Sequence, residues 1–282
     1  ICLKLLNATS EQKNRFKINQ ITGEAVDEFI RKMRITGVVS LRGNGRFLDF
    51  NSFEINKIDY ILDNYYTYMT YASKYDYFKY MGEIDNSILE IKEIHQEDIE
   101  DVKIRTLNKW ANEYSKEDII KELNIVCGKT ESKNDILRII DRPTRLEFLT
   151  SIALKQNFAD LEVYPSYHID DEGIPTFTAS GGMADIECFD KESNPLVEVT
   201  LMCARNQATN EVPAITRHLQ EAVAKYPSKI VFTILVAPSI HADTIYMTEF
   251  SKSRYKVDIL PMTVVEFVEQ IQSNSKIADL LV

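Results

Sequence analysis

The chain has 282 residues, 44% of them hydrophobic and 27% charged, so it has enough apolar side chain for one large core or two ordinary ones. The net charge of −10 argues against a uniformly basic nucleic-acid binder, although residues 1–50 hold nine Lys and Arg against five Asp and Glu. The longest apolar runs are too short to cross a bilayer, and we expect no contact with a membrane.

Other features of the chain bear on where the protein works. No signal peptide is recognisable. The four cysteines are scattered without a CxxC pair, which argues against a zinc site or a disulfide framework and predicts a reducing cytosol. The sequence begins with Ile1 rather than Met, so we expect it to be a C-terminal piece of a longer protein.

Residues 1–62 are predicted to form a small winged-helix-like unit. Apolar positions at helical spacing predict a helix over residues 23–34, and two short β runs around a Gly-Asn-Gly turn predict a hairpin over residues 37–50. Cations gather at the end of this helix and on either side of the turn, where they either contact phosphates or form an ordinary charged surface. The residues alone do not decide between these interpretations. The cations are Arg31, Lys32, Arg34, Arg42 and Arg46.

Residues 63–130 are predicted to be a helical spacer. Eight tyrosines lie between Tyr60 and Tyr80, both included. Tyrosines are able to stack on nucleic acid, but helix–helix packing with wet hydroxyls is the interpretation that we favour. Residues 83–122 are acidic and amphipathic and contain the single tryptophan, Trp110. No chemistry is predicted for this segment.

Residues 131–282 change in character and predict an α/β domain with a mixed sheet flanked by helices. A capping pattern at residues 132–135 opens a helix, and the apolar run of residues 230–236 is typical of a strand that is covered on both faces. Helices are expected over residues 144–156, 211–226, 242–251 and 263–272, and strands over residues 161–168, 184–189, 196–202, 229–237 and 257–260.

Two carboxylates on neighbouring predicted strands carry the chemistry. Asp185 begins one strand after a Gly-Gly stretch, and Glu198 stands in the middle of the next strand. A carboxylate inside an apolar strand is costly unless it is paired or binds a metal. Hard oxygen ligands suit Mg²⁺, which keeps waters and a phosphate in its shell and acidifies the water that it binds. The pair therefore predicts a Mg²⁺ site in an enzyme that cleaves phosphodiesters, although Glu198 is alternatively a salt-bridged core residue.

Three further side chains are candidates for the same site, and each also has an ordinary structural interpretation. Glu147 is the only acid in an apolar helix, where it is alternatively a residue that points outward. Glu211 and His218 are seven residues apart, so they lie on one face of a helix. A histidine in this setting is more often a hydrogen-bonded structural residue than an acid or a ligand.

At these residues the chain resembles the type IIS restriction endonucleases of the AlwI family, which are related to nicking endonucleases. A fainter likeness covers residues 34–42, which are similar to part of the DNA-recognition region of this family. The matching segments, in order and at compatible spacing, are Arg145-Leu-Glu-Phe-Leu149, Ala179-Ser-Gly-Gly-Met-Ala-Asp-Ile-Glu187, Leu196-Val-Glu-Val-Thr200, Gln207 and Glu211-Val-Pro-Ala-Ile-Thr-Arg-His218.

The resemblance implies a restriction-endonuclease-like fold, double-stranded DNA as the substrate, Mg²⁺ as the cofactor and the cytoplasm of a bacterium as the location. It divides the chain into part of a recognition region (1–62), a spacer (63–130) and a nuclease domain (131–282). Cutting both strands would need a second nuclease domain, from dimerisation or a partner subunit; otherwise the enzyme nicks. The resemblance carries over Asp185 and Glu198 as metal ligands, and Glu147, Glu211 and His218 as the other catalytic residues.

One departure from the wider superfamily concerns the position two residues after the strand glutamate, where Lys is usual and Thr200 stands here. The residues left to orient a water or to offset phosphate charge are Arg205, Gln207 and His218. The departure also motivates an alternative function, a DNA-binding or interaction module whose nuclease-like domain is inactive. A purely structural helical protein is the least favoured, because Glu198 and the apolar run at residues 230–236 predict a sheet.

Overall fold

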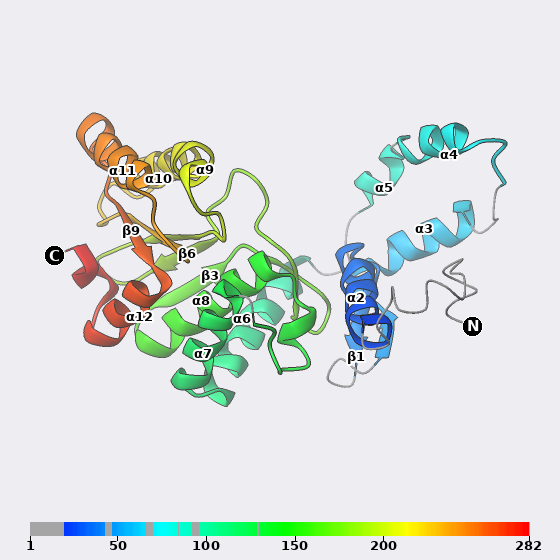
Figure 1. The fold of residues 1–282 in the computed structure, drawn as a ribbon, viewed down its shortest axis with the longest axis horizontal. Helices are drawn as coiled ribbons and strands as arrows, with labels where there is room; N and C mark the ends of the chain where they lie inside the picture. The colour runs from blue at the N-terminus through cyan, green and yellow to red at the C-terminus, as the bar shows by residue number, and fades with distance from the viewer. Residues whose placement is uncertain are drawn as a thin grey trace, which may run out of the picture.

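The computed structural model of the protein describes residues 20–42, 47–65, 70–83, 85–91, 96–128 and 130–281. A five-stranded sheet with the strand order β3-β6-β7-β8-β9 forms its centre (Figure 1). The pairs β3–β6 and β6–β7 are antiparallel, whereas β7–β8 and β8–β9 are parallel, so the predicted mixed sheet is confirmed. The strands are β3 (Glu162–Pro165), β6 (Ile186–Phe189), β7 (Leu196–Val199), β8 (Thr233–Ala237) and β9 (Ile259–Thr263).

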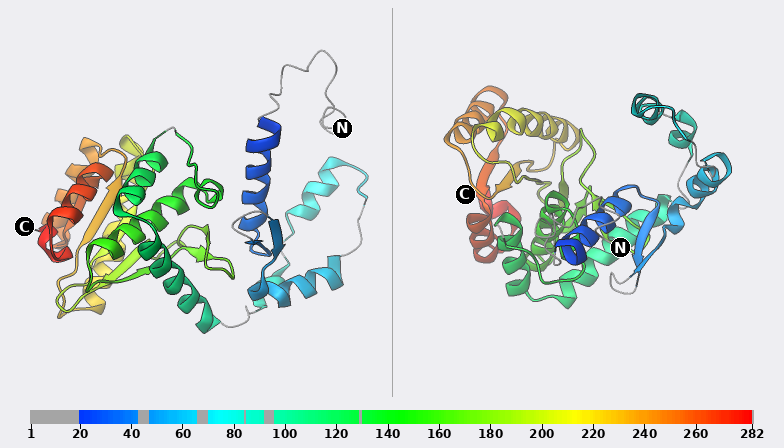
Figure 2. Two further views of the ribbon diagram at one scale, coloured as in Figure 1. Left: turned by 90° about the horizontal axis from the view of Figure 1, so that it is seen from below. Right: turned by 45° about the vertical axis from the view of Figure 1, so that its right-hand side comes forward.

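Helices cover both faces of this sheet, as Figures 1 and 2 show from three directions. The first face carries α6 (Gln96–Glu113), α7 (Lys116–Cys127), α8 (Arg142–Asn157) and α12 (Val264–Ser273). The second face carries α9 (Arg205–Asn210), α10 (Val212–Lys225) and α11 (Ala242–Tyr255). Local signals set several helix starts: Pro143 and Pro213 stand in first turns, and Thr263 with Glu266 forms a capping box on α12.

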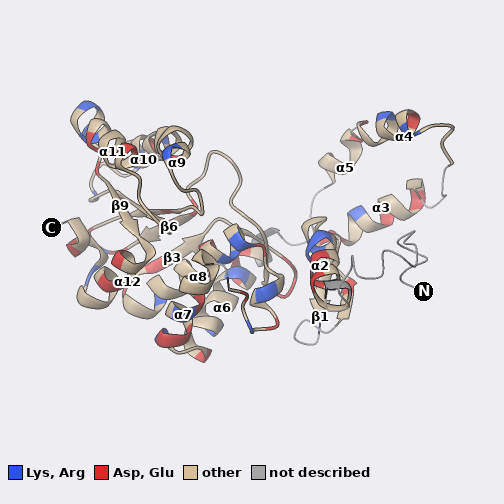
Figure 3. Ribbon diagram, viewed as in Figure 1, with Lys and Arg blue, Asp and Glu red and all other residues tan. Residues whose placement is uncertain are grey.

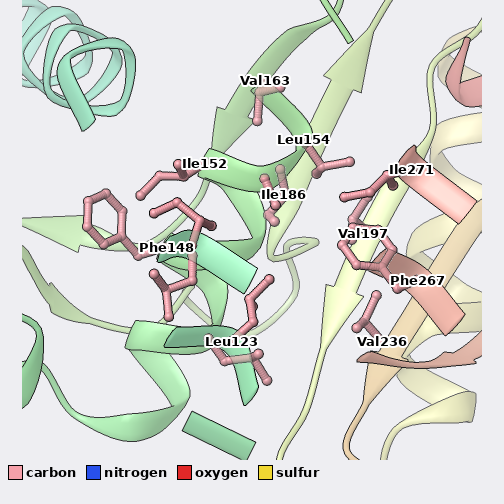
Figure 4. Packing of buried hydrophobic residues seen from close by; sticks show 14 of the residues in the cluster. Leu123, Phe148, Ile152, Leu154, Val163, Ile186, Val197, Val236, Phe267 and Ile271 are labelled. Atoms are coloured by element: carbon pink, nitrogen blue, oxygen red, sulfur yellow. The ribbon is translucent and has the colours of Figure 1, made fainter. Parts of the chain in front are cut away.

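The core follows from the alternation of side chains along the central strands. Ile234 and Val236 of β8 belong to a large apolar cluster with the helices of the first face, which Figure 4 shows from close by. Leu235 between them belongs to a second cluster with α10. All five residues of β8 are buried, as predicted for a strand covered on both faces. In β7, Val197 lies in the first cluster, so its neighbour Glu198 points toward α10.

The N-terminal part of the described chain contains the predicted helix and hairpin. They are α2 (Ala25–Ile35) and the antiparallel strands β1 (Val39–Arg42) and β2 (Phe47–Phe50); Arg46 and the Gly-Asn-Gly turn lie outside the described residues. A short turn, η2 (Gln20–Glu24), precedes α2, and η3 (Ser52–Glu54) follows β2. The helices α3 (Ile55–Tyr65), α4 (Lys74–Met81) and α5 (Asn86–Glu90) then extend away from the sheet (Figure 1).

Several parts of the chain differ from the prediction. The helix expected after residue 132 is a single 3₁₀ turn, η4 (Leu137–Ile139). Asn134 Oδ1 accepts the Ile136 and Leu137 N–H groups at its start, and the backbone turns extended at Ile140, with φ of −76° and ψ of 131°. Elements that were not predicted include the strand β5 (Pro175–Phe177), the helix α9 and the terminal turn η5 (Ile277–Leu281), while the predicted strand over residues 161–168 is divided into β3 and the start of β4 (His168–Ile169), which pairs with β5. These elements are short, and their sequences show no clear apolar period.

Helices α6 and α7 pack into the main core. Trp110 of α6 stacks on Tyr114 and meets the edge of Phe148 from α8, with ring centroids 4.4 and 5.0 Å apart. The second half of the predicted spacer is therefore part of the sheet domain's hydrophobic core. The expected packing of tyrosines is found among the described residues, where the ring centroids of Tyr71 and Tyr77 are 5.4 Å apart. None of the described helices combines the length and apolar character that a bilayer crossing requires.

The segment from α2 to η3 is called here the N-terminal element, and the part from α6 to η5 the sheet domain. Arginines of the N-terminal element bind carboxylates of the sheet domain. Arg34 pairs with Asp170 and Arg42 with Asp171, both in the turn between β4 and β5, while Arg31 binds the Asp141 carboxylate that precedes α8. Figure 3 shows basic and acidic positions mixed along α2. In this structure Arg31, Arg34 and Arg42 therefore bind carboxylates of the same chain.

Candidate active site

One open cleft brings all five predicted site residues together. It lies where β6 begins and β7 ends, and it has a volume of about 600 Å³. Helices α8 and α10 border it, as does the segment of residues 178–183, called here the cleft loop. The predicted residues that line the cleft are Glu147, Asp185, Glu198, Glu211 and His218.

Asp185 and Glu198 lie side by side on antiparallel chain segments. The Asp185 N–H is 3.4 Å from Glu198 Oε2, and the Val199 N–H donates to Asp185 Oδ2 over 2.8 Å. Glu198 is 6% exposed, whereas Asp185 is partly exposed at the cleft. The hairpin therefore presents two carboxylates at one point, each fixed by a backbone group of the other strand.

The cleft loop carries the Gly-Gly pair that precedes Asp185. Gly182 has φ of +92°, in the left-handed region that glycine tolerates without strain. A Cβ at Gly181 or Gly182 would meet no heavy atom within 4 Å. The requirement at Gly182 is therefore conformational, and the absence of side chains leaves the backbone of the loop open to the cleft.

Glu147 enters the cleft from α8 and is 3% exposed. Its Oε2 accepts the N–H of Ala179 in the cleft loop over 3.2 Å. Burial raises the pKa of Glu147 to about 8, and the charge of Glu198 acts in the same direction against the bond from Ala179. At neutral pH and without a cation nearby, this carboxyl group therefore holds a proton.

The other acids of the cleft repel one another in the same way. Burial raises the pKa of Asp185 well above its ordinary range, and the charges of Glu198 and Glu147 add to the effect. Burial also raises the pKa of Glu211, opposed by a 3.1 Å hydrogen bond from Thr200 Oγ1. Among the described residues that line the cleft, Arg217 is the only Lys or Arg, and it is exposed.

His218 contacts the strand glutamate directly. Its Nδ1 is 2.9 Å from Glu198 Oε1, and its Nε2 is buried without a hydrogen-bond partner. The structural interpretation of this histidine is thus correct in part, because the ring is hydrogen-bonded. Its partner is a predicted metal ligand, however, and such contacts orient ligating carboxylates.

Two of the three residues considered in place of the missing Lys do not line the cleft. Gln207 is fully buried; its Nε2 donates to the carbonyls of Met202 and Ser239, and its Oε1 accepts from His241 N–H and Thr244 Oγ1. Gln207 therefore joins the loop after β7 to the loop after β8 through these hydrogen bonds. Arg205 is exposed and pairs with Asp243.

Sequence reasoning had not assigned a role to Arg217 or to the N–H of Ala179. The signal for Arg217 was present, because it stands on α10 beside His218, six residues after Glu211. The bond from Ala179 to Glu147 joins two segments that are 32 residues apart, and no local pattern predicts it.

The donor chemistry of the cleft suits a hard divalent cation. Within the part of the chain that the structure describes, no three His, Cys, Asp or Glu side chains form a ready ligand set. Mg²⁺ nevertheless takes only one or two carboxylates from many proteins and fills its shell with waters and phosphate oxygens. Asp185 and Glu198 fit that share, because their carboxylates lie together at the ends of β6 and β7 and face the open cleft.

Comparisons with known proteins identify the family of the chain. The family model of the AlwI restriction endonucleases matches residues 82–270. Among solved structures, the chain is similar to the small subunit (R.BspD6I2) of the heterodimeric restriction endonuclease R.BspD6I, at 25% identity and a TM-score of 0.47, over 56% of this chain and 77% of that one. No curated protein sequence matches the chain.

The protein with this mixed sheet, and an acidic cleft where β6 begins and β7 ends, is a restriction-endonuclease-type DNA nuclease by its family match. The chain belongs to the AlwI restriction endonuclease family. The resemblance that was first recognised between Arg145 and His218 is thereby confirmed. The assignment rests on the family match, because the likeness to the solved structure is partial.

Proposed function

We propose that this protein is a Mg²⁺-dependent endonuclease of the type IIS kind, which hydrolyses a DNA phosphodiester near a recognition site in the cytoplasm of a bacterium. The observation that carries the proposal is the pair Asp185 and Glu198, fixed side by side in a cleft where acids repel one another. Family membership supplies DNA as the substrate class.

The roles of the residues follow from their positions. Asp185 and Glu198 would hold the ion, and Glu147 and Glu211 would complete the acidic cluster around it. When bound, Mg²⁺ supplies Lewis-acid chemistry, which acidifies water and offsets the negative charge that develops on a phosphate under attack. The two glycines of the cleft loop let the DNA backbone approach closely.

Two other side chains assist the acids. His218 orients Glu198 through its 2.9 Å contact and leaves its buried Nε2 for a water or a phosphate oxygen. Arg217 is exposed on the rim and offsets phosphate charge, in the absence of the usual Lys at Thr200. One such cleft cuts one strand, so double-strand cleavage requires a second nuclease domain, from another copy or a partner subunit.

Replacing Asp185 tests the proposal. The full-length protein is incubated with genomic DNA and Mg²⁺, and both ends of every fragment are sequenced to give the recognition site and the strands cut. We expect Asp185→Ala to abolish cleavage, whereas Glu187→Gln, which changes a nearby acid of β6 that does not line the cleft, should retain it. Cleavage by Asp185→Ala at the rate of the unchanged protein would show the assignment to be wrong.

A second candidate function is an inactive nuclease-like domain in a DNA-binding or interaction module. Thr200 in place of Lys favours it, as does the absence of a ready three-ligand set among the described residues. Calorimetric titration with Mg²⁺ and Mn²⁺ separates the two functions, because an inactive domain would bind neither ion and Asp185→Ala would change nothing.

A further inference from the structure

The turn between β4 and β5 is the point where the N-terminal element meets the sheet domain. It consists of Asp170, Asp171, Glu172 and Gly173, and it is called here the acidic turn. Gly173 has φ of +83°, and a Cβ there would overlap the side chain of Thr106 on α6. The Thr106 hydroxyl donates to the Glu172 carbonyl over 3.3 Å. The acidic turn is thus fixed from the side of the sheet domain.

Arg34 fixes the same turn from the other side. Its guanidinium is 3.0 Å from Asp170 Oδ2, and the two side chains are 2% and 1% exposed. The same Nη2 donates to the carbonyl oxygens of Ile174 and Pro175, at 3.3 and 3.0 Å, where β5 begins. Because both charges are buried, neither partner can leave without a large free-energy cost.

Arg42 holds the outer part of the acidic turn. Its two terminal nitrogens bind both oxygens of Asp171 at 2.8 and 2.7 Å, the bidentate geometry that fixes a carboxylate in orientation as well as distance. The N–H and the hydroxyl of Ser52 donate to the same carboxylate. The N-terminal element thus binds the acidic turn through Arg34, Arg42 and Ser52.

The β4–β5 hairpin leads from the acidic turn directly to the cleft loop. Residue 178, the first of the cleft loop, follows Phe177 at the end of β5, and Ala179 donates to Glu147 in the cleft. From the other strand, His168 Nε2 lies 3.0 Å from Ser180 Oγ. A shift of this hairpin would therefore move the cleft loop relative to the acids.

We propose that Arg34 and Arg42 are positioning residues, which hold the cleft loop in place through the acidic turn and the β4–β5 hairpin. The N-terminal element would then contribute to catalysis, because the cleft loop keeps its position relative to the acids only while that element is bound to the acidic turn. This inference rests on the proposed nuclease function for its effect on rate, but its structural part can be measured without any cleavage.

The test uses Arg42→Ala, because Arg42 is partly exposed and its loss leaves the buried Arg34–Asp170 pair intact. We expect faster backbone hydrogen exchange over residues 168–183 and a kcat on saturating DNA and Mg²⁺ about tenfold lower, with KM for DNA unchanged. Arg42→Lys keeps the charge but loses the bidentate geometry, so its kcat should lie between that of Arg42→Ala and that of the unchanged protein. The control is Lys252→Ala on α11, which removes an exposed ion pair with Asp258, a residue that precedes β9.

Each result decides a separate question. Faster exchange with an unchanged kcat overturns the inference, as does unchanged exchange. A different result would assign Arg42 to a phosphate contact. In that case the slope of log K for DNA binding against log salt would be smaller by about one in Arg42→Ala, and hydrogen exchange would not be faster. If Asp185→Ala still cleaves DNA, the proposed nuclease site is wrong. The hydrogen-exchange measurement would still test whether Arg42 fixes the β4–β5 hairpin.

Arg34 is tested with a milder change, because Arg34→Ala would leave Asp170 buried and alone. Arg34→Lys keeps a charge for Asp170 but cannot reach the carboxylate and both carbonyls of β5 with a planar group. We expect faster exchange at residues 174–179 and a kcat several times lower, measured well below the unfolding temperature. Unchanged exchange in a folded Arg34→Lys protein would overturn its positioning role.

Discussion

The cleft and the acidic turn both gather carboxylates, but they differ in what faces those carboxylates. In the acidic turn, Arg42 and Ser52 bind Asp171 and hold its pKa well below the ordinary value. Burial raises the pKa of Asp170 there, with Arg34 acting in the opposite direction. In the cleft, burial raises the pKa of Asp185 far above the ordinary value, and its neighbours Glu198 and Glu147 are acids that act in the same direction.

Under the proposed function, this difference separates carboxylates that hold the fold together from carboxylates that would bind a cation. A buried acid with an arginine partner contributes to stability, and its loss leaves an unpaired cation. A buried acid among other acids destabilises the fold until a cation binds, which is a cost that functional sites commonly carry. Removal of an acid should therefore act on activity in the cleft and on stability in the acidic turn.

The largest effect is expected from Glu198→Gln, which removes one charge of the predicted metal pair and keeps the shape of the side chain. The cleavage rate should fall on the order of a thousandfold, because the ion loses a ligand and the attacked phosphate loses its charge stabilisation. The unfolding temperature should not fall, since a repelling charge has been removed. Rates are compared in single-turnover assays with Glu187→Gln as the control. A variant that is inactive only because it is unfolded would not support the comparison.

Asp170→Ala should have the next largest effect, and on stability. It leaves the charge of Arg34 buried without a carboxylate, which costs about 3 kcal/mol of the free energy of unfolding. Urea denaturation measures this quantity. The double variant Arg34→Met with Asp170→Leu should regain most of the loss, because an apolar pair replaces a buried ion pair at little cost. An Asp170→Ala protein as stable as the original would contradict the role given to this pair.

His218→Ala should weaken Mg²⁺ binding about tenfold, the usual effect of removing a group that orients a ligating carboxylate. The cause would be the loss of the 2.9 Å contact that fixes Glu198 Oε1. Calorimetric titration of the variant with Mg²⁺ checks this expectation. Unchanged affinity together with a lower rate would instead assign His218 to contact with the substrate or water.

The smallest effect is a gain of stability on Glu147→Gln. The pKa of Glu147, about 8, lies above the ordinary value of 4.5, so the folded protein binds this proton more tightly than the unfolded chain. Its contribution to stability is therefore complete below about pH 4.5 and is lost as the pH rises through 8. Without metal at pH 8.5, the variant should therefore be more stable than the unchanged protein, with a Tm several degrees higher. At pH 4.5 the two proteins should melt together, and a variant that is less stable at pH 8.5 would break the comparison.

Much of the sheet domain could be predicted from the sequence because its signals are local. The buried run of β8 and the capping box before α12 are each contained in a few neighbouring residues. The grouping of Asp185 with Glu198 was within reach as well, because two adjacent strands joined by a tight turn bring their ends together. The match of the family to residues 82–270 confirms the resemblance built on those segments.

The contacts between distant segments could not be predicted, because no local pattern encodes them. Arg34 and Asp170 are separated by 136 residues, and from the sequence Arg34 was as well suited to a phosphate as to a carboxylate. Gln207 matched the family pattern and was considered for a catalytic role, yet the four hydrogen bonds of its side chain go to the loops after β7 and β8 and to the start of α11. Burial and partners, which distinguish these roles, arise only when the chain is folded.

The packing of α6 against α8 sets where the chain can be divided. A nuclease module grafted onto another DNA-binding protein could not begin at residue 131, because it would lose Leu107, Trp110 and Leu123 from its own core. It would have to begin ahead of Gln96, where α6 starts. Even then Asp170 would remain buried without Arg34, so a fusion would need either the α2 segment or an uncharged residue at position 170.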